Sequence, residues 1–102
     1  MKHLTLIVHT DIQQDVIDQL RNLEQISGFS YIPVEGHGIE VESDPFLMAR
    51  DTAVGHTART RIDILLEDEN VEFVLNSLRD SSSDIKGHSI YWVTNIEQSG
   101  RF

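Results

Sequence analysis

The sequence has 102 residues, a formal net charge of −9 and no cysteine. This length fits one domain with a single core. The acidic balance disfavours nucleic acid as a partner, because binding to a phosphate backbone needs clustered Lys and Arg. Without cysteine there are no disulfides or thiolate nucleophiles, and the remaining metal ligands are histidines and carboxylates.

No apolar run approaches the roughly 20 residues that span a bilayer, and the N-terminus lacks the features of a signal peptide. We therefore expect a cytoplasmic protein with no membrane insertion.

The N-terminal part of the sequence has the pattern of a strand followed by a helix. Residues 4–9 alternate between apolar and more polar side chains, which indicates a strand. Thr10 and Asp11 then offer an N-cap for a helix of about four turns. The apolar face of this helix would be formed by Ile12, Val16, Leu20 and Leu23.

A second strand and a long loop follow. Gly28 is expected to end the helix, because Gly takes the left-handed conformation without a Cβ penalty. Residues 29–34 are rich in aromatic and β-branched side chains and predict a strand, which Pro33 places at a sheet edge. Residues 35–56 have no sustained period, and structureless connections of this length are usually functional or flexible. We therefore expect this loop to carry function.

The second half of the sequence repeats the order of strand, helix and strand. Residues 57–66 alternate again and predict a third strand. The acidic stretch at residues 67–69 suits a helix N-terminus, and the helix that follows would bury Val71, Val74, Leu75 and Leu78. Residues 89–96 are dense in Ile, Tyr, Trp, Val and Thr and predict the fourth strand.

This element order predicts an α+β fold of the ferredoxin-like βαββαβ type. Right-handed crossovers place both helices on one face of a four-stranded antiparallel sheet. The other face would expose Ile7, Leu65 and either Tyr91 or Trp92, together with His9 and two arginines. Exposed apolar patches often mark protein contacts, which favours a homo-oligomer. The alternative is that these are scattered surface residues, which are normal in monomers.

Particular residues also resemble a known family. The second strand ends in Val34-Glu35-Gly36-His37-Gly38 and leads into a long loop, as in the PII signalling proteins (nitrogen regulatory proteins). Gly55-His56-Thr57, followed by residues 61–78, is similar to the third strand, acidic turn and second helix of that family. The ending Tyr91-Trp92-Val93-Thr94, taken with Gly28-Phe29 and Gly36-His37-Gly38, more narrowly resembles small PII-like proteins associated with heavy-metal efflux. The similarity covers nearly the whole chain.

The resemblance implies a trimer with ligand sites between its subunits. PII proteins bind ATP or ADP in clefts between subunits and dock their large loop on enzymes, transporters or channels. Carried over to this sequence, the ligand-binding residues are Gly36, His37, Gly38, Lys86, Gly87, His88 and Arg101. The phosphate-binding turn of the family is rich in Gly, whereas residues 81–89 contain one glycine and have His88 where a cation is expected. This departure weakens the case for ATP or ADP and leaves the cofactor unknown.

Histidines are the residues best suited to specific chemistry in this sequence, because neutral imidazole is a ligand for zinc, copper and nickel. His37 and His56 flank the long loop, and His88 could approach them from a neighbouring subunit. These three are the candidate metal ligands. The alternative is that each is a polar surface or strand-end residue.

The loop also contains an apolar triplet, Phe46, Leu47 and Met48. An apolar triplet in a polar loop is an anchor that could dock in a partner, or it folds back onto its own or a neighbouring subunit. No nucleophile elbow, His-Glu-x-x-His or phosphate-binding loop is present, so we do not expect an enzyme.

We therefore expect residues 1–102 to form a single PII-like domain. It would act as a homotrimeric sensor that binds a small ligand or metal ion and signals through residues 35–56. The candidate partner is a membrane-bound heavy-metal efflux or transport complex. The alternative function is direct binding of a transition metal by the loop histidines, in a metal-tolerance protein.

Overall fold

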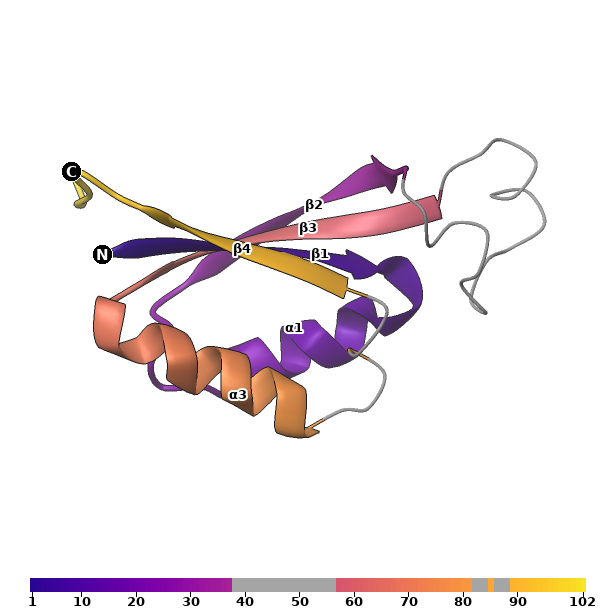
Figure 1. The fold of residues 1–102 in the computed structure, drawn as a ribbon, viewed down its shortest axis with the longest axis horizontal. Coiled ribbons are helices and arrows are strands. Elements are labelled where there is room, and N and C mark those ends of the chain that lie inside the picture. Colours follow the sequence, from indigo (N-terminus) through magenta and orange to yellow (C-terminus); the bar gives the residue numbers. More distant parts are fainter. Residues whose placement is uncertain (38–56, 82–84, 86–88) are drawn as a thin grey trace.

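All the predicted strands and helices are present, in the predicted order, in a computed structural model that describes residues 1–37, 57–81, 85 and 89–102 (Figure 1). The strands are β1 (Lys2–His9), β2 (Phe29–Gly36), β3 (Thr57–Leu66) and β4 (Ser89–Asn95). The helices are α1 (Gln13–Arg21) and α3 (Val71–Ser81). A single turn of 3-10 helix precedes each of them, at Thr10–Ile12 and at Asp68–Asn70.

The four strands form one antiparallel sheet in the order β2-β3-β1-β4. Both helices lie on the same side of this sheet (Figure 1). The predicted α+β, ferredoxin-like architecture is thereby confirmed. Pro33 lies in β2, at an edge of the sheet, as its missing N–H requires.

The core lies between the sheet and the two helices. Leu4 pairs with Ile64 on β3 and with Val93 on β4, and Leu4 and Ile64 are almost fully buried. Because side chains alternate along a strand, the same face carries Leu6, Val8, Ile62 and Leu66. The helices contribute Val16, Leu20, Val71, Val74, Leu75 and Leu78 to this cluster. The apolar periods in the sequence therefore identified the buried faces correctly.

The start of the first helix differs from the prediction. The residue that caps its first turn is His9, whose Nδ1 accepts a hydrogen bond from the Asp11 backbone N–H at 3.1 Å. Thr10 and Asp11, which were predicted as caps, are already part of the 3-10 turn. The side chain of Gln13, the first residue of α1, accepts a hydrogen bond from the Thr60 hydroxyl on β3.

The end of the helix also differs, because α1 stops at Arg21 and not near Gly28. Beyond it, the backbone N–H of Leu23 donates to Leu20 O and that of Ile26 donates to Leu23 O, so the chain continues in tight turns. These turns bring Leu23 and Ile26 against the core, where both are partly buried. A straight helix would carry the chain away from the start of β2, so core packing ends the helix before the glycine.

Residues 35–56 were predicted to form the long loop, but β2 extends to Gly36 and residues 38–56 lie outside the described part of the chain. The ends of β2 and β3 that connect to this segment lie at one end of the sheet, and the N- and C-termini lie at the other (Figure 1). None of the helices formed by the described residues is long and apolar enough to cross a membrane.

Candidate functional site

The sheet has a second face that neither helix covers (Figure 1), and we call it the open face. Strand alternation and register place on it the side chains opposite to the core positions. Four of these are large, apolar and between 40% and 56% exposed: Ile32, Leu65, Ile90 and Trp92. The prediction was correct for Leu65 and Trp92. Tyr91 points to the helix side, and Ile7 belongs to the open face but is half-buried.

The register shows that the apolar residues lie close together. Ile32 pairs with Arg61, Arg61 with Ile7, and Ile7 with Ile90, so one row crosses all four strands. In the neighbouring row on the same face, Trp92 pairs with Thr5. The open face therefore carries a continuous surface on which apolar side chains alternate with a small number of charges.

The charges at the centre of the open face form one hydrogen-bonded network. His3 Nε2 lies 2.7 Å from Asp63 Oδ1, and the Arg61 Nε donates to both oxygens of Asp63 at 3.2 Å. The hydroxyl of Thr5, a fully buried residue, donates to Asp63 Oδ1 at 3.4 Å. The Arg61 guanidinium also lies 6.0 Å from the centre of the Trp92 ring, within cation–π range.

Asp63 is the acceptor on which this network converges. Burial alone would raise its pKa, but the hydrogen bonds from His3 and Arg61 and the positive charge of Arg61 hold the pKa of Asp63 below its usual value. The carboxylate is therefore ionised at neutral pH and fixes its three partners on the open face. This arrangement suits a preformed contact surface, because its partly exposed charges are already paired and would stay paired when the face is covered.

The predicted ligand-binding residues fall into two groups where the structure describes them. Gly36 and the exposed His37 lie at the loop end of β2. Arg101 lies at the opposite end, where it lines a pocket of about 450 Å³ with Phe29 and Asp63. Gly38, Lys86, Gly87 and His88 lie outside the described residues. One chain thus does not bring Gly36 and His37 together with Arg101.

The predicted metal and docking residues are described only in part. His37 is exposed, whereas His56 and His88 lie outside the described residues, as do the docking residues Phe46, Leu47 and Met48. Within residues 1–37, 57–81, 85 and 89–102, no group of three or more His, Asp or Glu side chains is placed to hold a metal ion. The metal site therefore stays a prediction.

The network around Asp63 could not be predicted from the sequence. Arg61 and Asp63 were recognised as polar positions of a strand, and His3 as one of five histidines, but nothing in the sequence joined them. The signal is the β1–β3 register, which pairs Thr5 with Asp63 and so brings His3 diagonally within reach. A register is fixed only by the folded sheet.

The fold defines a small α+β protein with two helices on one face of a four-stranded antiparallel sheet. The sequence matches, over residues 1–102, the family described as protein of unknown function (DUF3240), and the chain belongs to that family. No curated protein matches the sequence.

A solved structure has the same fold. The crystal structure of a DUF3240 family protein from Shewanella baltica OS155 is similar to this chain, with a TM-score of 0.72 and 24% sequence identity. The match covers 99% of this chain and 94% of that chain. At this identity the similarity supports the fold, and the function has to be argued from the residues of this chain.

Proposed function

We propose that this chain is a non-enzymatic, PII-like regulatory protein that works as a homotrimer. It binds a small ligand or a metal ion in clefts between subunits and signals through residues 35–56 to a partner. A heavy-metal efflux system is the candidate partner. The observation that carries the proposal is the open face, because a solvent-exposed sheet surface of this composition is best explained by contact with further copies of the chain.

The composition of the open face supports assembly over a scattering of apolar residues. Ile32, Leu65, Ile90 and Trp92 each keep at least 40% of their surface exposed, and burial of apolar surface contributes about 25 cal/mol per Å². The network around Asp63 lowers the cost of covering the charges, since they already have partners. Homodimer interfaces are more apolar than the rest of the surface and are enriched in aromatic residues and Arg, and this face carries Trp92 beside Arg61.

The positions of the predicted ligand residues support clefts between subunits. Gly36 and Phe29 lie at opposite ends of β2, about 23 Å apart for a strand that rises roughly 3.3 Å per residue. Arg101 lies beside Phe29. The predicted ligand set can therefore meet only if different subunits contribute its two halves.

Assembly is tested by replacing Leu65 with Asp and measuring mass by sedimentation velocity. The wild-type protein is expected to sediment at three times the mass of one chain, and Leu65→Asp as a monomer, because the substitution places a charge in the interface. Phe73→Asp is the matched control: Phe73 is 48% exposed and Leu65 46%, but Phe73 lies on α3, away from the open face. A monomeric wild-type protein, or equal behaviour of the two variants, would refute assembly through this face.

Ligand binding is tested by thermal unfolding of metal-stripped protein with ATP, ADP, zinc, copper or nickel. A ligand at about 100 times its Kd stabilises the folded state by about 2.7 kcal/mol, which raises the unfolding temperature measurably. A rise with any one of them supports a sensor. If only a metal acts, and replacing His37, His56 and His88 with Ala abolishes the effect, direct metal binding is the better description. No rise with any of the five would contradict the ligand part of the proposal.

A further inference from the structure

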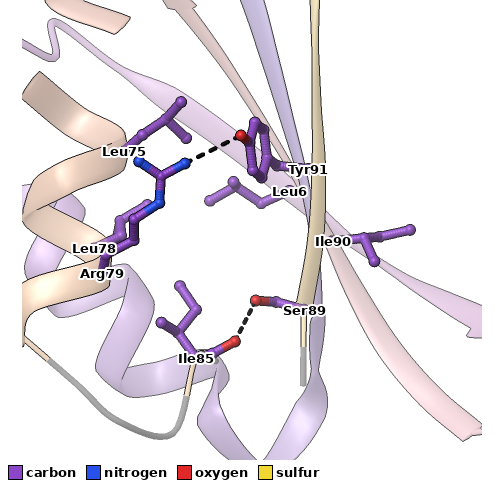
Figure 2. Close-up of a pocket in the computed structure, with 8 residues that line it drawn as sticks. All are labelled: Leu6, Leu75, Leu78, Arg79, Ile85, Ser89, Ile90 and Tyr91. Carbon is purple, nitrogen blue, oxygen red and sulfur yellow. Dashed lines mark hydrogen bonds between the residues drawn. The ribbon is translucent and has the colours of Figure 1, made fainter. Parts of the chain in front are cut away.

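A pocket of about 180 Å³ opens between α3 and β4, on the helix side of the sheet (Figure 2). Its floor is apolar and formed by four buried side chains: Leu6 from β1, Leu75 and Leu78 from α3, and Ile85. Its outer wall is Tyr91, which is 47% exposed on the outermost strand of the sheet. Of the described residues that line the pocket, only Ile90 also belongs to the open face, and the pocket lies within a single chain.

Among the described residues that line the pocket, Arg79 carries the positive charge at its mouth. Arg79 extends from α3 toward β4 and donates from Nη2 to the Tyr91 hydroxyl at 3.1 Å, as Figure 2 shows, with its guanidinium 5.8 Å from the centre of the Tyr91 ring. Its Nη1 donates to Asn76 Oδ1 at 3.0 Å, which also holds the side chain in place. Of the described residues that line the pocket, none is acidic.

These two side chains still have donors to offer. A guanidinium has five N–H groups, and the hydrogen bonds of Arg79 to Asn76 and Tyr91 use two of them. The Tyr91 hydroxyl accepts the hydrogen bond from Arg79, so its own hydrogen points elsewhere and can be donated. A fixed guanidinium beside a hydroxyl donor is an arrangement that binds a carboxylate through charge-assisted hydrogen bonds.

The volume of the pocket indicates the size of the apolar part of the ligand. An engineered cavity of about 150 Å³ lined by Leu, Ile and Phe binds benzene, so this pocket has room for one six-membered ring. A deep apolar part with a few convergent polar groups at one end is the usual form of a small-molecule site. We propose that this pocket binds a small aromatic carboxylate, with the ring between Leu6, Leu75, Leu78 and Ile85 and the carboxylate at Arg79 and Tyr91.

The site does not depend on the function proposed above, since every residue named comes from one chain. Benzoate is the probe, and the methyl signals of Leu and Ile are followed by NMR during the titration. For a ligand this small we expect a Kd of roughly 1 mM, with the largest shifts at Leu6, Leu75, Leu78 and Ile85. Absence of binding, or shifts centred elsewhere, would overturn the proposal.

Two further probes separate the charge from the ring. Benzamide has the same shape without the charge, and acetate has the charge without the ring, so each is expected to bind at least about tenfold more weakly than benzoate. Equal binding of benzamide would show that Arg79 does not recognise the carboxylate and would reject the proposal.

Variants test the residues at the mouth. Arg79→Gln is expected to weaken benzoate binding by about tenfold or more, and Tyr91→Phe by a smaller factor, because a charged donor is lost in the first and a neutral one in the second. The matched control is Arg21→Gln, at an exposed arginine in the last turn of α1, away from the pocket, which should bind as the wild type does. If Arg79→Gln folds, as judged by its methyl spectrum, and still binds benzoate with unchanged affinity, the site is not the one proposed.

Discussion

A single carboxylate, Asp63, organises the polar part of the open face. Its oxygens accept hydrogen bonds from three side chains on two strands, and its side chain is 30% exposed. In a hydrogen-bonded network of this kind the loss of the acceptor leaves several donors without a partner. The pairing depends on the charge of Asp63, so its contribution to stability depends on pH.

We predict that Asp63→Asn lowers the free energy of unfolding at pH 7 by about 1 kcal/mol, given the partial exposure of the pair. The pKa of Asp63 is depressed in the folded state. Its stabilisation is therefore fully present above the unfolded-state value of about 3.9 and is lost as the pH falls through the lower folded value. Urea unfolding of wild type and variant at fixed protein concentration should show the two curves converging below about pH 4.

Asp80→Asn is the control for this experiment, because Asp80 is an exposed residue of α3 outside the network. Its unfolding free energy should track that of the wild type across the pH range. A gap between Asp63→Asn and wild type that stayed constant down to pH 3 would mean that the charge of Asp63 contributes nothing to the fold.

The two helices show how far sequence patterns reach. The period of α3 identified its buried residues and its acidic start, because both signals are local. The end of α1 was predicted wrongly, since Leu23 fits the helical period and still lies in a turn.

Strand β4 has apolar residues on both faces, so its period could not decide between Tyr91 and Trp92. The pairing of Leu4 with Val93 decides it, and that pairing is a property of the sheet.

We predict that Gly28→Ala leaves stability unchanged or raises it by up to about 1 kcal/mol. A Cβ at Gly28 would meet no atom within 4 Å, and its φ does not lie in the left-handed region. Alanine also narrows the unfolded ensemble, which favours the folded state. Thermal or urea unfolding measures the change. A loss of more than 1 kcal/mol would instead indicate that Gly28 adopts the left-handed conformation predicted from the sequence.

At the scale of the whole molecule, the described residues of the helical layer are more acidic than those of the open face. The helical layer carries most of the described acidic residues, among them Asp15, Asp18, Glu69, Glu72 and Asp80, whereas Arg59 and Arg61 lie on the open face. Sequence composition predicted the acidic balance but not this separation, which arises when the helices take one side of the sheet. The same limit applies to the pocket: Arg79 and Tyr91 are 12 residues apart in the chain, and only the packing of α3 beside β4 joins them.

Trp92 gives the open face a property that no other part of the molecule shares. It is the one tryptophan of the sequence, and its indole stands on the open face, 40% exposed, beside the Arg61 guanidinium. The tryptophan fluorescence of the protein therefore originates from this face. When another molecule covers the face, water leaves the indole and its emission shifts to shorter wavelength. The emission wavelength of the unlabelled protein, measured during dilution, therefore reports whether the sheet is covered.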